Sequence, residues 1–118
     1  MKVAVVGSRG FGDLEMVRAY VRSLPVGTVV VSGGARGVDS VAVAEAERIG
    51  LETIVFIPNW KKHGKRGGII RNTLIVESAD MLVAFWDGQS AGTGSSILLA
   101  QEKGIPTDVY KAKEKGAS

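Results

Sequence analysis

Three glycine-rich turns, each placed after a short apolar run, constrain the fold of this chain most strongly. Residues 7–10 follow the run VAVV, residues 32–39 follow TVVV, and residues 88–96 come shortly after MLVAFW. Apolar runs with few charges suit strands that are covered on both faces. Strands that alternate with helices form a parallel sheet with right-handed crossovers. We therefore expect the three turns at the carboxyl edge of one sheet, where ligands of open α/β folds bind.

The pattern predicts an α/β, Rossmann-like three-layer fold. We expect a parallel five-stranded sheet in the order 3-2-1-4-5, with helices on both faces. The predicted strands are residues 2–6, 28–31, 53–57, 80–86 and 105–110, and the predicted helices are residues 13–24, 40–49, 69–78 and 95–103. Pro25 ends the first helix, Gly50 and Gly104 close later ones, and Asp39 has the position of an N-cap. Residues 59–68 are predicted to form a polar, basic loop.

The composition fits one domain with a substantial core. The chain has 118 residues, of which 45% are hydrophobic. Residues 1–110 are expected to form this domain and residues 111–118 a basic, solvated tail. The lack of cysteine excludes disulfides, thiolate metal sites and a cysteine nucleophile. No apolar run is long enough to span a bilayer, and the first residues resemble a strand more than a signal peptide, so a cytoplasmic location is expected.

Common cofactor motifs are missing from the turns. The first turn lacks the pattern G-x-G-x-x-G, and no acidic residue closes the second strand to hold a ribose, so NAD is disfavoured. No Walker A sequence is present, which excludes a P-loop NTPase. His63 is the only histidine, and no second metal ligand supports it. No cofactor or metal is therefore required, and a nucleotide or nucleotide-derived ligand stays open.

The turns are suited to bind an anion. Glycine lets the backbone come close to a ligand, and helix amino-termini offer free N–H groups to phosphate. We predict one phosphate-binding crevice, while plain strand-to-helix connections are the alternative. The candidate ligand-binding residues are Gly7, Ser8, Arg9, Ser32, Gly33, Gly34, Arg36, Gly37, Asp39, Arg71, Asn72, Gly92, Thr93, Gly94 and Ser95. Ser90 and Ser96 add hydroxyl groups at the third turn.

The charged candidates each have a second interpretation. Arg9 lies beside the point where the strand order reverses, where it contacts phosphate or stays solvated. Arg36 binds phosphate or forms a salt bridge at the rim. Arg71 binds an anion or pairs with Asp80 or Asp87.

A basic segment follows the third predicted strand. It contains an aromatic ring and four cations: Trp60, Lys61, Lys62, Lys65 and Arg66. These residues suit the backbone and a stacked base of a nucleic acid, or else form a solvated charged loop. Trp86, at the end of a predicted strand, likewise stacks on a base or packs in the core. The net charge of +3 permits contact with nucleic acid without requiring it.

The chain resembles the SLOG superfamily over almost its whole length. The likeness rests on VVSGGARGVDSVAVAEAERIG, on FIPNW followed by HGKRGGIIRN, and on ADMLVAFWDGQSAGTGSSILLAQEKGIP. It is most similar to the small YspA-type branch of this superfamily, which also contains the DNA-processing protein DprA and the LOG phosphoribohydrolases. The resemblance implies a Rossmann-like fold and a ligand that is a nucleotide, a nucleotide derivative or, as in DprA, single-stranded DNA.

The resemblance also implies roles for particular residues. The matches to DprA are Gly7, Ser8 and Arg9 in its GSR start, Ser32, Gly33, Gly37 and Asp39 in its glycine-rich phosphate motif, and Arg71 and Asn72 in its RN pair. LOG enzymes carry a glutamate where this chain has Ser96, so hydrolysis or transfer at the N-glycosidic bond of a nucleotide is the disfavoured alternative. We expect binding or sensing of a phosphate-bearing ligand. The expected partner is a nucleotide-type small molecule or single-stranded DNA, with no membrane contact, and a homo-oligomer stays open.

Overall fold

The computed structural model describes residues 1–111 of the chain. Its strands are β1 (Lys2–Gly7), β2 (Val29–Ser32), β3 (Glu52–Val55), β4 (Met81–Phe85) and β5 (Thr107–Tyr110). Its helices are α1 (Leu14–Arg22), α2 (Val38–Arg48), α3 (Trp60–His63), the 3-10 turn η1 (Gly64–Arg66), α4 (Gly67–Ser78) and α5 (Ala91–Lys103). None of the helices in this range is long and apolar enough to cross a membrane. The predicted tail lies outside the described residues from residue 112 onward.

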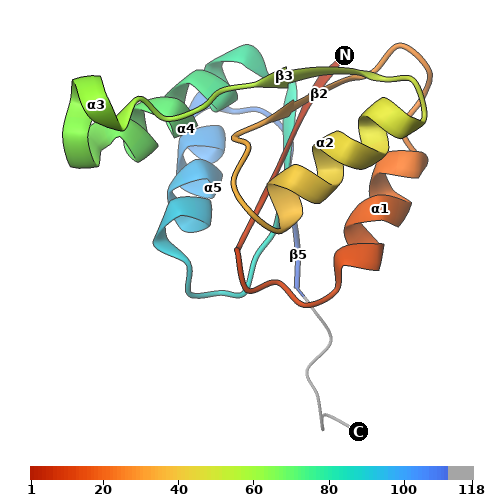
Figure 1. Ribbon diagram of the computed structural model, residues 1–118, viewed down its shortest axis with the longest axis horizontal. Helices are drawn as coiled ribbons and strands as arrows, with labels where there is room; N and C mark the ends of the chain where they lie inside the picture. The colour runs from red at the N-terminus through yellow and green to blue at the C-terminus, as the bar shows by residue number, and fades with distance from the viewer. Residues whose placement is uncertain (112–118) are drawn as a thin grey trace, which may run out of the picture.

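The strands of the described range form one parallel sheet in the order β3-β2-β1-β4-β5. Helices α1 and α2 cover one face of the sheet, and α4 and α5 cover the other, so three layers are stacked (Figure 1). The predicted fold class and strand order are confirmed. The chain order reverses between β1 and β4, and the carboxyl ends of these two strands therefore form the switch point of the sheet.

The middle of the sheet is buried on both faces because the inner residues of its central strands are apolar. In β1, Val3 and Val5 belong to the core cluster of α1 and α2, whereas Ala4 and Val6 belong to the cluster of α4 and α5. Each of these four residues is at most 5% exposed. Side chains of a strand alternate between its two faces, so a strand covered on both sides holds no charged residue at its centre.

The predicted loop at residues 59–68 is wrong, because this segment contains α3, η1 and the first turn of α4. Asn59 caps α3 by accepting a hydrogen bond from the N–H of Lys62 at 3.0 Å. Trp60 lies against Gly67 and Gly68, which have no side chains to keep it away. The segment is polar and shows no apolar spacing, so its sequence carries no helical signal.

Helix α5 begins earlier than predicted, at Ala91 instead of Ser95. Gly92, Thr93 and Gly94 are therefore residues of its first turn and not of the preceding loop. Helix α4 also begins early, at a pair of glycines. Glycine is a poor helix former, which is why the sequence pattern places both starts after the glycines.

Helix α2 begins at Val38, directly after Gly37. Gly37 has a φ of 84°, a conformation that glycine adopts far more easily than other residues. The predicted N-cap role of Asp39 is therefore wrong. Asp39 lies inside the helix, and its carboxylate binds backbone groups of other segments.

Candidate functional site

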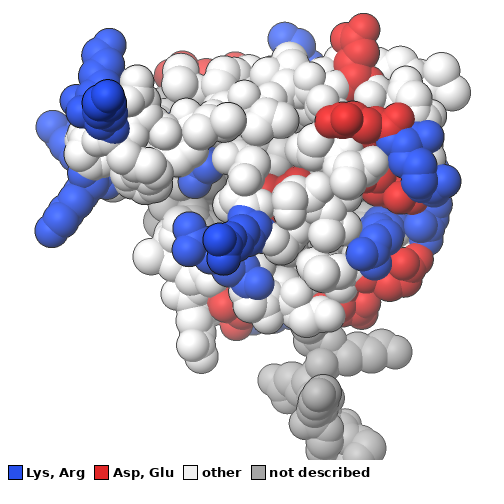
Figure 2. Space-filling view, viewed as in Figure 1, with Lys and Arg blue, Asp and Glu red and all other residues white. Residues whose placement is uncertain are grey.

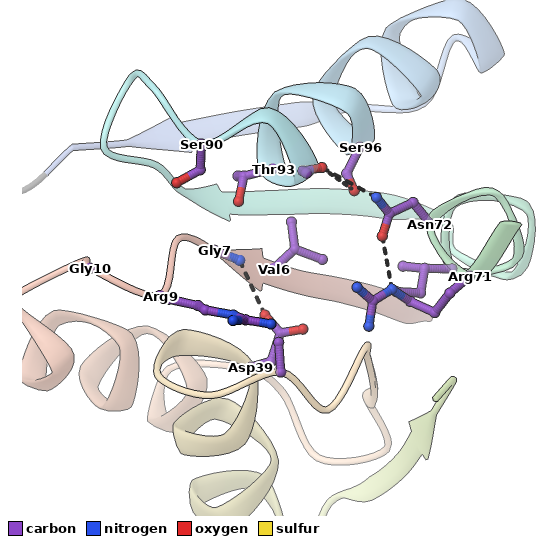
Figure 3. Close-up of a pocket in the computed structure, with 13 residues that line it drawn as sticks. Val6, Gly7, Arg9, Gly10, Asp39, Arg71, Asn72, Ser90, Thr93 and Ser96 are labelled. Carbon is purple, nitrogen blue, oxygen red and sulfur yellow. Dashed lines mark hydrogen bonds between the residues drawn. The ribbon is translucent and has the colours of Figure 1, made fainter. Parts of the chain in front are cut away.

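A cavity of about 320 Å³ lies at the switch point of the sheet, beside the ends of β1 and β4 (Figure 3). Its walls come from β1 and the turn after it, the second turn and α2, and from α4 and α5. The lining residues are Val6, Gly7, Arg9, Gly10, Ala35, Asp39, Arg71, Asn72, Ile75, Ser90, Gly92, Thr93 and Ser96. This volume is at the lower end of the range for small-molecule sites, about 300 to 1,000 Å³.

The cavity gathers part of the predicted site from all three turns. The candidate ligand-binding residues that line it are Gly7, Arg9, Asp39, Arg71, Asn72, Gly92 and Thr93, together with the hydroxyl residues Ser90 and Ser96. The candidates that do not line it are Ser8, Ser32, Gly33, Gly34, Arg36, Gly37, Gly94 and Ser95. The second turn therefore contributes less to the cavity than its sequence predicts.

Four lining residues were not among the candidates: Val6, Gly10, Ala35 and Ile75. Val6 is an apolar residue near the end of β1, and Ile75 follows Arg71 by one helical turn on α4. Gly10 and Ala35 belong to turns that the sequence does single out. Val6 and Ile75 could have been found only from their spacing along the predicted strand and helix. Their apolar side chains by themselves indicate packing in the core and not a binding site.

Asp39 links the turns after β1 and β2. The residue is only 4% exposed, and its carboxylate accepts hydrogen bonds from the N–H groups of Gly7 at 3.2 Å and Gly33 at 3.1 Å. Burial raises the pKa of Asp39, and the hydrogen bond from Gly33 and the positive charge of Arg71 oppose this rise. The N–H groups of Gly7 and Gly33 are thus already engaged and are not available to a phosphate.

Ser8 and Ser32 use their hydroxyl groups inside the protein. Ser8 is 1% exposed, and its Oγ accepts a hydrogen bond from the N–H of Asp87 at 3.1 Å. Ser32 is fully buried, and its Oγ accepts from the N–H of Gly34 and donates to the carbonyl of Asp39, both at 3.5 Å. Both serines hold the turns in place, and neither lines the cavity.

Arg71 connects the second turn to α4 and α5. Its Nη1 donates to the carbonyl oxygen of Gly33 at 2.7 Å, and its Nε donates to Oδ1 of Asn72 at 2.9 Å. The Nδ2 of Asn72 in turn donates to the carbonyl oxygen of Gly92 at 3.3 Å. One chain of hydrogen bonds therefore runs across the cavity wall from the turn after β2 to the first turn of α5.

Two guanidinium groups face the cavity. Arg9 and Arg71 reach toward it from opposite sides, with Asp39 between them (Figure 3). Burial lowers the pKa of Arg71; the negative charge of Asp39 opposes this shift, and the positive charge of Arg9 adds to it. The predicted alternative in which Arg71 pairs with Asp80 or Asp87 is wrong, because those carboxylates accept backbone hydrogen bonds elsewhere. The carboxylate of Asp39, which lies between the two arginines, already opposes their mutual repulsion.

The start of α5 also faces the cavity. Its N-cap, Ser90, makes no side-chain hydrogen bond to the helix. The hydroxyl of Ser90 donates to Asp87, whose carboxylate also accepts the N–H groups of Ser90 and Gln89, and these hydrogen bonds lower the pKa of Asp87 to about 2. Gly92 and Thr93 in the first turn line the cavity. The partial positive charge of an uncapped helix start is therefore presented to any bound anion.

The basic segment lies apart from this cavity. Its cations project from α3 and η1 and form the blue group at the left end of the molecule (Figure 2). Trp60, beside them, is 54% exposed. Trp86 also lies outside the cavity, and its Nε1 donates to the carbonyl oxygen of Ser90 at 3.0 Å. The ring of Trp86 packs against Gly94 in the first turn of α5, and stacking of a base on it stays a prediction.

A doubly wound parallel sheet with a ligand-sized cavity at its switch point defines the class of Rossmann-like α/β proteins. Within this class, the chain belongs to the YspA, cpYpsA-related SLOG family, whose family model matches residues 1–63. The predicted resemblance to SLOG proteins is confirmed. The "Gene 61 protein" of Mycobacterium phage D29 is 36% identical over 115 residues, covering 89% of this chain and 92% of that protein.

Two solved structures share the fold. DNA processing protein A (DprA) from Streptococcus pneumoniae matches with a TM-score of 0.79 and 24% identity, over 99% of this chain and 52% of that chain. DprA from Helicobacter pylori, known from work on its single-stranded DNA binding mode, matches with a TM-score of 0.71 and 23% identity, over 100% of this chain and 67% of that chain. The present chain spans about half the length of the pneumococcal protein.

Proposed function

We propose that the protein binds a phosphate-bearing ligand of nucleotide type in the cavity between β1, α4 and α5. The observation that carries this proposal is the convergence of Arg9, Arg71 and the uncapped start of α5 on one cavity. Guanidinium groups and helix N-terminal N–H groups both stabilise phosphate. The phosphate binds at the start of α5, because Asp39 already engages N–H groups of the turns after β1 and β2.

Hydrolysis of an N-glycosidic bond remains the disfavoured alternative. Ser96 stands where LOG-type enzymes carry a glutamate, and its Oγ donates to the carbonyl oxygen of Gly92 at 3.3 Å. Among the described lining residues, Asp39 is the only carboxylate. Asp39 is buried and holds two backbone N–H groups, so it is poorly placed to act on a ribose. We therefore infer that the protein binds or senses its ligand without changing it.

Replacing Arg9 by alanine is expected to weaken binding of ribose 5-phosphate by about tenfold or more, because a hydrogen bond to a charged group contributes about 1.5–3 kcal/mol. Arg9 is exposed, so the melting temperature should change little. Isothermal titration calorimetry measures the affinity. Arg36→Ala is the matched control, since Arg36 is an exposed arginine of the second turn that does not line the cavity. Equal losses in the two variants would contradict a specific role of Arg9.

A second candidate ligand is single-stranded DNA, which the basic segment favours. The segment presents exposed cations and the half-exposed ring of Trp60, and these groups suit the phosphates and a stacked base of a nucleic acid strand. The Helicobacter pylori protein of the same fold has a single-stranded DNA binding mode. A small nucleotide would occupy the cavity alone, so the two candidates differ in whether the basic segment takes part.

Binding of a single-stranded oligonucleotide is expected to weaken with salt, with a log–log slope of about −0.7 per phosphate neutralised. Replacing Lys61, Lys62, Lys65 and Arg66 by serine should flatten this slope. The same variant should bind ribose 5-phosphate normally, because none of the four side chains lines the cavity. Fluorescence anisotropy across a salt series measures the slope. If the unchanged protein fails to bind the oligonucleotide even at low salt, DNA is excluded and the small nucleotide is left.

A further inference from the structure

The two faces of the sheet are covered by helices of different character. In α4 and α5, the side chains of Ile69, Leu74 and Leu98 are 62%, 44% and 61% exposed. Helices α1 and α2, which lie wholly within the described range, expose no large apolar side chain to this extent. Their surface carries ion pairs instead, such as the pair between Glu45 and Arg48. The layer of α1 and α2 is therefore suited to contact with water, whereas the layer of α4 and α5 is less so.

A second cavity, of about 770 Å³, lies along α5. Its lining includes the ring of Trp86, small and polar residues of α5, and Leu98. Leu98 thus belongs both to this cavity and to the exposed apolar side chains. We call the surface formed by Ile69, Leu74, Leu98 and Trp86 the α4–α5 face. Apolar side chains that gather on one surface, beside a cavity, indicate contact with another macromolecule.

Opposite charges lie at the two ends of the α4–α5 face. The basic segment directly precedes α4, and its four cations project at one end of the molecule (Figure 2). Glu77 and Glu102 are exposed in the last turns of α4 and α5. Both helices lead from the carboxyl edge of the parallel sheet back to its amino edge, so both carboxylates lie at the other end. Within residues 1–111, neither these carboxylates nor the four cations form an ion pair.

A surface with an apolar middle and opposite charges at its ends is complementary to itself after a twofold rotation. The helices of the two copies then run antiparallel, and the basic segment of each copy meets Glu77 and Glu102 of the other. We propose that the α4–α5 face binds a second copy of this chain in this arrangement and forms a symmetric dimer. Four cations meet two carboxylates at each end, so the basic segment keeps a positive charge in the dimer.

This dimer stands apart from the proposed function. None of the residues that define the α4–α5 face lines the cavity at the switch point, and neither do Glu77 and Glu102. A failure of the dimer therefore leaves the proposed ligand site untouched, and a failure of that site leaves the dimer untouched.

Sedimentation equilibrium across a series of protein concentrations tests the apolar middle of the interface. The unchanged protein should form a dimer. Leu98→Glu and Leu74→Glu should each weaken it by at least about tenfold, because a carboxylate would be buried there without a partner. Val26→Glu is the matched control, since Val26 is fully exposed between α1 and β2, away from the α4–α5 face. Circular dichroism should show that all three variants fold, because each replaced side chain is exposed.

Charge reversal tests the orientation of the two copies. One variant combines Glu77→Lys with Glu102→Lys, and the second has glutamate in place of the four cations of the basic segment. Each variant by itself should dimerise at least about tenfold more weakly, because like charges then meet at both ends of the interface. An equal mixture of the two variants should form a mixed dimer, since both ends again join opposite charges. Added salt should weaken this mixed dimer.

Four results would overturn the proposal. The first is a protein that stays monomeric at its highest soluble concentration. The second is a dimer that Leu98→Glu and Leu74→Glu leave as stable as Val26→Glu does. The third is a pair of charge-reversed variants that each dimerise like the unchanged protein, and the fourth is a pair that does not associate when mixed. If Leu98→Glu and Leu74→Glu fail to fold, the charge-reversed pair decides.

Discussion

Replacing Asp39 by alanine is expected to lower the free energy of unfolding by about 3–5 kcal/mol, the usual effect of removing one partner from a buried charged contact. The substitution leaves the N–H groups of Gly7 and Gly33 without their acceptor and Arg71 without the carboxylate beside it. Each buried donor left unsatisfied costs about 1–3 kcal/mol by itself. Urea denaturation followed by circular dichroism measures the change.

Asp13→Ala is the matched control for this experiment. Asp13 is also an aspartate that accepts a backbone hydrogen bond, from the N–H of Met16 at 3.1 Å, but it does so as the N-cap of α1. Loss of an N-cap typically lowers stability by about 1 kcal/mol. If Asp39→Ala and Asp13→Ala lower the free energy of unfolding equally, Asp39 contributes no more stability than a helix cap. The inference that Asp39 links two turns would then be wrong.

Gly7→Ala is expected to lower the melting temperature by about 10 °C, because overpacking a core costs about 1–3 kcal/mol and 1 kcal/mol corresponds to about 4 °C in a domain of this size. A Cβ on Gly7 would lie 2.5 Å from Cβ and Cγ2 of Val38, the first residue of α2. Val38 is fully buried and β-branched, so it cannot easily move away. A thermal melt followed by circular dichroism measures the shift.

Gly10→Ala shows whether that shift comes from the contact with α2. Gly10 lines the same cavity, but a Cβ placed there meets no atom within 4 Å. This variant should change the free energy of unfolding by less than about 0.5 kcal/mol, as most surface substitutions do. Similar melting temperatures for Gly7→Ala and Gly10→Ala would mean that the stability of the protein does not depend on the close approach of β1 and α2.

The strand order could be predicted because the strand signals in this chain agree with one another. VAVV and TVVV are uncharged and each runs directly into a turn, and a strand-and-helix alternation permits few topologies. The starts of α4 and α5 could be predicted less accurately than the strand order. The glycines that open α4 and α5 have low helix propensity, and only packing against the sheet makes these residues helical.

The candidate site could be predicted only in part, because sequence position does not tell which way a polar side chain points. Arg9 and Arg71 do reach the cavity. Ser8 and Ser32 stand in the same turns, yet their hydroxyl groups turn inward to satisfy backbone N–H groups. Asp39 near a helix start looks like a cap, and only the folded backbone shows that its carboxylate serves other turns.

Because Asp39 accepts hydrogen bonds from the turns after both β1 and β2, the protein itself holds these turns in place. A preorganised cavity saves the entropy that mobile loops lose on binding. The proposed ligand would then enter without a slow rearrangement, at a rate set by diffusion and by the attraction of Arg9 and Arg71 for anions. The arginines would govern how fast an anion is captured, and the contacts at the start of α5 how long it stays.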